Sequence, residues 1–333
     1  KKWQKAAYQQ SIEIVKENNI QLVHQLNMIG FREPGYLWKW ANRLPFIWGP
    51  VGGFNQIPFN YIFQFDTKNK IFYFGKNLIH HLQVHLHTRV RQALKKADLI
   101  LAESSSTKRI IKKVYKIDSV LMNETGADFE DFYEHTSFCA NKSLNLLWVG
   151  KILGRKGLPI ALETLKFLKG KIPVTLTVIG DGPDELACRQ LAEKIGVNDM
   201  VTFLGKKPNK EVKDLMRVHD LFFFTSLGEG TPHVVLEALS NGLPVLCHDA
   251  CGHGDIINDS IGIKVPMTSF QKSIELFAEK IEFLFHNQNM LYEFTRNAKV
   301  AAEINSWKNK AKKMNEIYKN VVLNKAVQNK HSL

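Results

Sequence analysis

The chain has 333 residues, enough for about two domains, and 44% of them are hydrophobic, which suffices for two buried cores. No run approaches 18 consecutive apolar residues, which argues against a membrane-spanning helix. The net charge of +13 is uneven, because residues 1–116 carry 19 Lys and Arg against 6 Asp and Glu, whereas residues 117–333 are balanced.

The first part of the chain alternates short apolar runs with helical patterns, which predicts a parallel sheet. We expect strands at 20–24, 45–48, 97–103 and 120–122, and helices at 8–18 and 88–96. A Ser/Thr run at 104–107 can cap a further helix. Gly52 and Gly53 follow the second strand in a glycine-rich turn, where backbone amides stay open at the carboxyl end of a strand. Ligands gather at that edge of doubly wound sheets.

Aromatic side chains crowd the same region, with 14 of the 35 Phe, Trp and Tyr between residues 31 and 74. Basic residues interleaved with aromatics can indicate a membrane surface, an anionic ligand or nucleic acid. Many of these aromatics are expected simply to fill the core.

After an expected linker at 128–142, the second half repeats the alternation. Apolar runs predict strands near residues 146, 174, 201, 221, 245 and 263. Helical patterns lie between them at 158–168, 184–195, 209–217 and 232–239, followed by an amphipathic helix at 268–285 and a long lysine-rich helix at 294–322. The four cysteines have no zinc-binding spacing, which favours reduced thiols in a cytosolic protein.

The stretch 222–245 joins a strand, a glycine loop and a helix start. Thr231 offers a hydroxyl at the helix start, and Pro232 suits a first helical position. Free amides at a helix N-terminus favour a phosphate or a sugar hydroxyl. Glu229 lies in the loop and Glu237 lies one and a half turns inside the helix, where a carboxylate could bind a ribose diol. An ordinary turn with two solvated glutamates is the alternative.

Three other stretches have the same character: 147–157, a strand and a loop with three cations; 178–183, a strand and a glycine turn; and 201–207, a strand ending at Gly-Lys-Lys. In this order, and with seven residues between Glu229 and Glu237, they resemble the retaining nucleotide-sugar glycosyltransferases of family 4, whose architecture is called GT-B. The resemblance covers about residues 145–265.

The resemblance implies an α/β GT-B fold with two Rossmann-like parallel-sheet domains facing a cleft. Residues 1–135 would form an N-terminal acceptor-side domain that is truncated, since its first β/α units are missing. Residues 143–300 would form the nucleotide-sugar-binding domain. Residues 301–333 would form a C-terminal helix that crosses back to the N-terminal domain.

The resemblance also assigns site residues. Lys151 and Lys156 match two phosphate-binding positions, although the first is usually arginine; Arg155 could compensate. Glu237 would hold the ribose diol, and Glu229 would lie beside the donor sugar and the reacting centre. The remaining donor-binding candidates are Gly230, Thr231, Pro232, His233, Val234, Val235, Gly180, Gly182, Gly205 and Lys207.

For the acceptor side, the family often has a histidine where this chain has Leu26; His24 either substitutes for it or is a buried strand histidine. Gly52 and Gly53 would line the cleft, and Arg32 could meet an anionic acceptor. No Asp-x-Asp pair is present, so we expect no metal, and no cofactor besides the nucleotide-diphosphate sugar that serves as donor substrate.

The function expected first is a retaining glycosyltransferase of cell-surface polysaccharide biosynthesis, acting on a saccharide or lipid-linked saccharide acceptor. Such a protein would be cytoplasmic and peripheral on the inner face of an anionic membrane. One alternative is a sugar-nucleotide epimerase or phosphorylase of the same architecture, which would convert its substrate without an acceptor. A basic nucleic-acid-binding module is the least expected alternative. We therefore predict that nucleic acid is not a partner.

Overall fold

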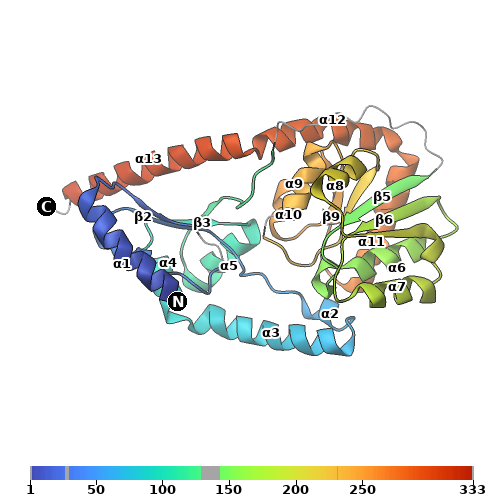
Figure 1. Cartoon of the computed structure of the whole chain (residues 1–333), viewed down its shortest axis with the longest axis horizontal. Helices are drawn as coiled ribbons and strands as arrows, with labels where there is room; N and C mark the ends of the chain where they lie inside the picture. The colour runs from blue at the N-terminus through green and yellow to red at the C-terminus, as the bar shows by residue number, and fades with distance from the viewer. Residues whose placement is uncertain (1, 27–29, 129–142, 231, 332–333) are drawn as a thin grey trace. The chain divides into compact units, whose positions relative to one another are not determined.

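A computed structural model describes residues 2–26, 30–128, 143–230 and 232–331. The chain divides into two compact units (Figure 1). Unit 1 comprises Lys1–Gln56, Lys76–Glu124 and Lys308–Leu333, and unit 2 comprises Ile57–Gly75 and Thr125–Trp307. Apart from Asp128, the expected linker at 128–142 lies outside the described residues, as do Cys139 and Thr231.

Unit 1 contains a four-stranded parallel sheet with the strands in sequence order. Its strands are β1 (Val23–Gln25), β2 (Phe46–Val51), β3 (Leu99–Ala102) and β4 (Val120–Leu121). Strand β2 is buried along nearly its whole length because helices cover both faces of the sheet, as the continuous apolar runs predict. The prediction of a parallel sheet in this part is confirmed.

Unit 1 also contains helices, most of which pack on the two faces of this sheet. They are α1 (Lys2–Glu17), the 3-10 helix η1 (Leu37–Asn42), the second half of α3 (Thr67–Leu86), α4 (Thr88–Lys96), α5 (Ser105–Tyr115) and α13 (Trp307–His331). Ser104 caps α5, since its hydroxyl accepts a hydrogen bond from the Thr107 amide. On the opposite face Ile47 and Leu101 pack against Ile317 and Tyr318 of α13.

Helix α3 is absent from the sequence-based expectations. Its sequence is apolar or aromatic on more than one side, so it lacks the single apolar stripe that identifies an amphipathic helix. The segment before it, with α2 (Phe59–Ile62), belongs to unit 2, because Ile57, Tyr61, Ile62 and Tyr73 enter the core of that unit. The expected domain boundary near residue 135 therefore misses this excursion.

Unit 2 contains a six-stranded parallel sheet in the order β10-β9-β8-β5-β6-β7. Its strands are β5 (Leu144–Val149), β6 (Val174–Ile179), β7 (Val201–Gly205), β8 (Leu221–Phe224), β9 (Val245–His248) and β10 (Gly262–Val265). Numbered within the unit, this is the order 3-2-1-4-5-6 of the Rossmann fold. All six strands lie where the apolar runs predict them.

Helices cover both faces of the second sheet (Figure 1). The helices are α6 (Leu158–Leu168), α7 (Glu185–Lys194), α8 (Asn209–Met216), α9 (His233–Ser240), α10 (Cys251–Ile256), α11 (Phe270–His286) and α12 (Gln288–Ile304), with short 3-10 helices η2 (Gly154–Lys156) and η3 (Asn198–Met200). Helices α6, α7 and α11 pack into one core and α8 and α9 into the other, whereas α12 contributes to both.

The single long helix predicted at 294–322 is wrong. The chain forms two helices, α12 and α13, that are interrupted between Ile304 and Trp307. At the interruption the Ala127 amide donates to the Asn305 carbonyl at 2.9 Å, and the Trp307 amide donates to the Ala127 carbonyl at 3.3 Å. This pairing takes the backbone groups that a continuous helix would need, a competition that no pattern within 294–322 reveals.

None of the helices among the described residues is both long and apolar enough to cross a bilayer. The three described cysteines, Cys188, Cys247 and Cys251, are buried and form no disulfide with one another. Burial raises the pKa of the Cys188 thiol to about 12, so this thiol is not a ready nucleophile.

Candidate active site

The order of the second sheet identifies one position where a ligand is expected. Strands β5 and β8 are neighbours, but the chain leaves β5 towards β6 on one side and β8 towards β9 on the other. Between such strands the connecting loops diverge and leave a crevice at the carboxyl edge of the sheet. The loops after β5 and β8 carry Lys151, Lys156 and Glu229, which the topology therefore brings to one edge.

Backbone contacts fix these two loops to each other. The Leu227 amide donates to the Arg155 carbonyl at 2.8 Å, and the Thr225 hydroxyl donates to the Lys156 carbonyl at 3.1 Å. Gly157 follows Lys156 at the end of the loop after β5 and has a φ of 72°. A Cβ at this position would meet the Thr225 carbonyl oxygen at 2.3 Å. Only glycine fits this approach, so the cationic loop is held against the end of β8.

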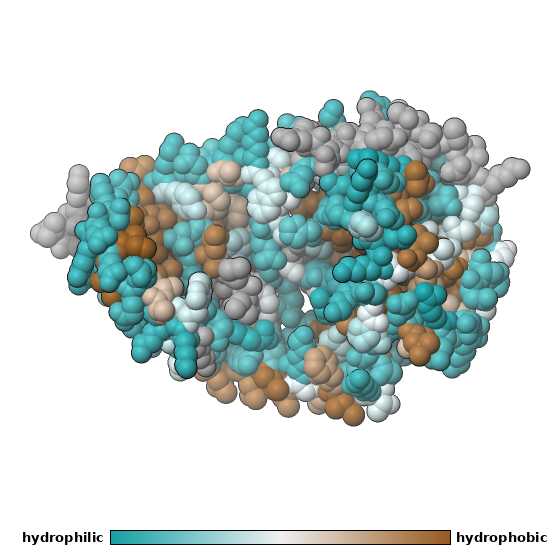
Figure 2. Space-filling model, in the orientation of Figure 1, coloured by the Kyte–Doolittle hydropathy of each residue, from teal (hydrophilic) through white to brown (hydrophobic). Residues whose placement is uncertain are grey.

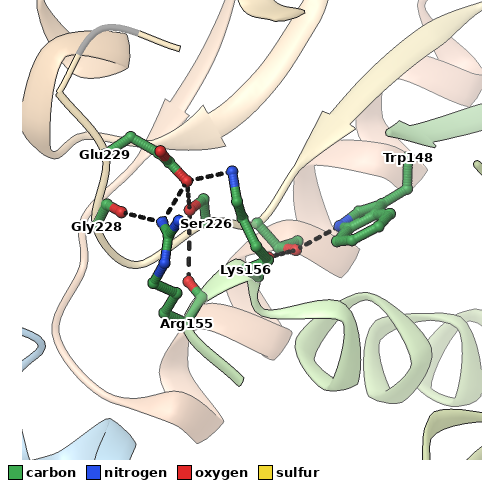
Figure 3. A network of polar contacts seen from close by, with 7 residues as sticks. Trp148, Arg155, Lys156, Ser226, Gly228 and Glu229 are labelled. Carbon is green, nitrogen blue, oxygen red and sulfur yellow. Dashed lines mark hydrogen bonds and ion pairs between the residues drawn. The ribbon is translucent and has the colours of Figure 1, made fainter. Parts of the chain in front are cut away.

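The side chains at this edge form a network centred on one carboxylate (Figure 3). Glu229 Oε1 accepts from Arg155 Nη1 at 2.7 Å and from the Ser226 hydroxyl at 3.1 Å, and it forms an ion pair with Lys156 Nζ. Arg155 Nη1 also donates to the Gly228 carbonyl at 2.9 Å. The network joins residues more than 70 positions apart in the sequence.

The network has an excess of positive charge. Two cations share one carboxylate, and the side chains of Lys156 and Glu229 are each only 15% exposed. Partial exclusion of water strengthens the attraction of such a site for an added anion. Lys151 lies on the same loop after β5 and is exposed to solvent, so a third cation is available at this edge.

Two buried histidines next to the network add no charge to it. Burial, with repulsion from Lys156 and Lys264, lowers the pKa of His253 to about 3. Burial also lowers the pKa of His248 to about 3, and repulsion from His253 adds to the effect. His248 Nε2 lies 2.9 Å from the Ser273 hydroxyl, whereas neither ring nitrogen of His253 has a protein partner. Both imidazoles are neutral at pH 7.

Glu237 lies in a separate pocket on α9. The pocket has a volume of about 160 Å³, and its lining includes His233, Lys213 and the Asn209 side chain. The Asn209 amide donates to Glu237 Oε1 at 3.2 Å. The pocket is polar and can accept a hydroxyl-rich group. Assignment of a ribose to Glu237 stays a prediction.

The start of α9 differs in one detail from the expectation. Pro232 is the N-cap residue and not the first helical residue, so the helix begins at His233. His233 is exposed, Val234 is half-buried and Val235 is fully buried, so His233 has the most accessible side chain of the three. The Gly230 carbonyl already accepts a hydrogen bond from the Gly252 amide at 2.9 Å. Residue 231 lies outside the described residues.

The glycines of the neighbouring strands are explained by close backbone packing. A Cβ on Gly180 would meet the Gly150 carbonyl oxygen at 1.9 Å, and one on Gly182 would meet the Ile152 carbonyl oxygen at 2.1 Å. They hold the loop after β6 against the cationic loop. Gly205 has φ of 67° and open space around it, and Lys207 pairs with Glu211 at 3.1 Å.

The residues expected on the acceptor side all lie in unit 1, where several have protein partners. His24 Nδ1 lies 2.8 Å from the Tyr318 hydroxyl and Nε2 lies 2.7 Å from the Gly49 carbonyl oxygen. Both nitrogens are thus engaged, and burial lowers the pKa of the ring. The Gly53 amide donates to Glu103 Oε1 at 3.0 Å, and a Cβ on Gly52 would collide with the same carboxylate.

Arg32 is held by α3. Its Nε donates to the Gln83 side chain at 2.5 Å, and its Nη2 lies 2.5 Å from His80 Nδ1. Burial lowers the pKa of the Arg32 guanidinium and, together with the nearby cation, lowers the pKa of His80 to about 4. An acceptor role for Arg32, His24, Gly52 or Gly53 stays a prediction.

Sequence reasoning missed three residues of this edge, Ser226, Asn209 and Lys213. Ser226 had a usable signal, because it follows β8 directly in a Thr-Ser pair at the carboxyl end of a strand. Asn209 and Lys213 are separated by one helical turn of α8, a spacing that surface helices often show, so nothing marked them. Among the described residues no cluster of three His, Cys, Asp or Glu side chains is arranged to hold a metal ion.

The model of the family described as glycosyl transferases group 1 matches residues 135–301, half of the chain. The chain belongs to the group 1 glycosyltransferases. The network of Glu229, Arg155 and Lys156 lies within the matched residues, as do Glu237 and its partner Asn209.

Several curated relatives match this glycosyltransferase. A putative colanic acid biosynthesis glycosyltransferase, WcaL of Salmonella typhimurium, is 26% identical over 49% of this chain and 42% of its own length. A putative teichuronic acid biosynthesis glycosyltransferase, TuaC of Bacillus subtilis, is 28% identical over 60% of this chain and 49% of its own length. The chain thus spans about half the length of these relatives or less.

Two solved structures show the fold. The lipopolysaccharide outer core galactosyltransferase WaaB aligns with a TM-score of 0.67 at 17% identity, covering 94% of this chain and 78% of WaaB. Anabaena HepE in complex with UDP aligns with a TM-score of 0.64 at 16% identity, covering 93% of this chain and 81% of HepE. Together with the two parallel sheets, they confirm the predicted α/β GT-B class with two Rossmann-like domains.

Proposed function

We propose that this glycosyltransferase transfers a sugar from a nucleotide-diphosphate sugar to a saccharide acceptor with retention of the anomeric configuration. The observation that carries the proposal is the network in which Lys156 and Arg155 share the carboxylate of Glu229 at the switch point of the Rossmann sheet. Such a site has the charge that a diphosphate requires. The UDP complex of HepE, whose fold is similar, is consistent with this choice of donor.

In the proposed reaction the cations stabilise the departing diphosphate. Negative charge develops on the phosphate oxygens as the bond to the anomeric carbon breaks, and fixed cations aimed at those oxygens lower the barrier. Lys156 and Arg155 act from the half-buried network, and Lys151 closes on the diphosphate from solvent. Each charge-assisted hydrogen bond is worth about 1.5–3 kcal/mol.

Glu229 has two roles in this scheme. Without donor it is the shared counter-charge of Lys156 and Arg155, so that the two half-buried cations are not left without a negative partner. When the diphosphate takes its place beside them, the carboxylate is free to turn towards the sugar, where positive character develops at the anomeric carbon. A protein nucleophile is not needed, since the acceptor can attack from the face that the diphosphate leaves.

Glu237 is proposed to hold the ribose hydroxyls from its pocket beside His233. A carboxylate accepts two hydrogen bonds from a cis-diol, and the Asn209 amide fixes its orientation. The transfer is proposed to need neither a bound metal nor a cofactor, because the protein cations supply the charge at the diphosphate. Added EDTA should then leave the rate unchanged.

The names of the relatives suggest the pathway class. WcaL and TuaC are described as glycosyltransferases of colanic acid and teichuronic acid biosynthesis. We infer that this chain serves polysaccharide biosynthesis, with a saccharide or lipid-linked saccharide as acceptor and with Arg32, Gly52 and Gly53 on the acceptor side. We further propose a cytoplasmic location, peripheral on the inner face of the membrane, where the protein would meet a lipid-linked acceptor.

A ligand screen tests the proposal. Thermal shifts are measured with UDP-, GDP- and ADP-sugars on the wild type, on Glu237→Gln and on Lys194→Gln, which removes a cation far from the site. One sugar nucleotide should stabilise the wild type and the Lys194 variant, and stabilise Glu237→Gln less. NMR of the product then gives the anomeric configuration. Conversion of the donor without a saccharide acceptor would indicate an epimerase or phosphorylase, and inversion would refute retention.

A further inference from the structure

The second half of α3, which belongs to unit 1, exposes a row of large apolar side chains. Leu78, Ile79, Leu82 and Leu86 are between 49% and 70% exposed. Their spacing places them on one face of the helix, opposite the face where Asn77, His80 and Val84 are buried. We call these four residues the α3 stripe. Figure 2 shows apolar side chains gathered along the edge where α3 lies.

Helix α5 of the same unit presents the complementary charge. Lys108, Arg109, Lys112 and Lys113 are all exposed, and at 100° per residue they fall within an arc of about 140° on the helix. We call them the α5 cations. Lys112 pairs with Asp118 at 2.6 Å, which leaves this face with a clear excess of positive charge.

A groove lies between the two helices. The Tyr115 hydroxyl on α5 donates to the Val84 carbonyl on α3 at 2.5 Å, which fixes the two helices side by side. The groove has a volume of about 440 Å³, and its lining includes His81 and His85 from α3 and Lys113 and Val114 from α5. A cation, imidazoles and apolar side chains therefore line the same groove.

Acidic side chains are scarce around this surface. From residue 67 to residue 117 the sequence contains only Asp98 and Glu103. Asp98 accepts from the Phe46 amide and pairs with Lys325, and Glu103 is buried. Neither opposes an approaching anionic surface.

We propose that the α3 stripe, the α5 cations and the groove between them form the surface by which the protein docks on an anionic lipid bilayer. The stripe inserts at the level of the lipid headgroups, and lipid phosphates meet Lys113, His81 and His85 in the groove. The proposal deepens the peripheral location given under the proposed function and rests on it. Exposed leucines on a helix held beside the cationic helix favour a bilayer over nucleic acid, which would leave the stripe in water.

The expected effects follow from the number of groups involved. One lysine near an anionic bilayer contributes about fivefold to the partition coefficient, so neutralising four cations should lower it by about two to three orders of magnitude. Replacing three stripe leucines by serine should lower it by at least about tenfold for the partial loss of inserted apolar surface.

Vesicle sedimentation tests the proposal. The chain is mixed with vesicles of phosphatidylcholine alone or with an equal part of phosphatidylglycerol. The stripe variant carries Leu78→Ser, Leu82→Ser and Leu86→Ser, and the cation variant carries Lys108→Gln, Arg109→Gln, Lys112→Gln and Lys113→Gln. The control is Leu186→Ser with Val218→Ser, two residues of unit 2 that are 68% and 65% exposed. Thermal unfolding and the thermal shift with nucleoside diphosphate check that each variant is folded.

The proposal expects the wild type and the control to bind vesicles that contain phosphatidylglycerol, and both other variants to lose binding while still recognising the diphosphate. Equal binding to both lipid compositions would overturn it, as would full binding by the stripe variant. Loss of a dimer in the stripe variant, without vesicle binding by the wild type, would overturn it in favour of a second copy. Because sedimentation needs no donor, a negative result here leaves the transfer reaction standing.

Discussion

Replacing Glu229 by glutamine tests whether this carboxylate holds the two cations of the site. Glutamine has nearly the same shape and can still accept a hydrogen bond from Arg155, so the change removes mainly the negative charge. In the wild type, Lys156 and Arg155 both pair with Glu229. In the variant these two cations repel each other without a counter-charge.

The expected cost lies between two limits. Breaking a fully buried ion pair costs about 3–5 kcal/mol, whereas an exposed pair is worth about 1 kcal/mol or less. The side chains of Glu229 and Arg155 are 15% and 31% exposed, so we expect Glu229→Gln to lower the free energy of unfolding by about 1–2 kcal/mol. For a domain of 150–250 residues this corresponds to a decrease in Tm of about 2–8 °C.

The assay is thermal unfolding at low salt, with and without pyrophosphate, followed by transfer kinetics. Pyrophosphate no longer has to displace the carboxylate in the variant, so it should bind about fivefold to tenfold more tightly than to the wild type. Turnover should fall at least about tenfold, because Glu229 is no longer available beside the sugar. Glu185→Gln, which breaks an exposed pair with Arg189 on α7, should change the Tm by less than about 2 °C.

Two results would refute this reasoning. An unchanged Tm at low salt would mean that the network does not hold the cations in solution. Equal or weaker pyrophosphate binding by Glu229→Gln would mean that the carboxylate does not compete with the phosphates. Either outcome would separate Glu229 from the proposed phosphate site.

Three further predictions concern the backbone, the pH dependence and the exposed cation. Gly157→Ala should lower the free energy of unfolding by at least about 2 kcal/mol more than Gly170→Ala, because both glycines have positive φ but only Gly157 is crowded. Urea unfolding of the two variants measures this difference. The pKa of His253 is lowered to about 3, below about 6.5 in the unfolded chain, so its contribution to stability falls as pH drops below about 6.5. His253→Leu should reduce that slope by up to about 1.4 kcal/mol per pH unit between pH 6 and 4. Lys151→Ala should lower kcat/KM by about one to two orders of magnitude with no change in Tm. The control Lys194→Ala should change neither kcat/KM nor Tm.

Each of these has its own contradicting outcome. Similar costs for the two glycine variants would mean that the Thr225 carbonyl can move away, and the cationic loop would not be fixed. An unchanged pH slope in the His253 variant would mean that this imidazole is protonated in the folded state. A kcat/KM for Lys151→Ala equal to that of Lys194→Ala would remove Lys151 from the site.

Part of the site was predictable from local patterns. The loops after β5 and β8 follow short apolar runs without polar alternation, and parallel strands place their carboxyl ends at one edge. Gly157 and Gly180 mark turns at that edge. Local patterns did not show that Glu229 pairs with Lys156 and Arg155, because such a pairing depends on how β5 and β8 lie side by side.

The sequence by itself determined the strands of both sheets, their parallel direction and the edge that carries the cations, since the period of apolar residues and the glycines act over a few neighbouring positions. Only the tertiary structure decided that residues 57–75 join unit 2, that α12 and α13 separate where Ala127 pairs, and that the α3 stripe stays exposed. Those outcomes depend on which distant surfaces compete for the same apolar side chains and backbone groups, and no local pattern contains that competition.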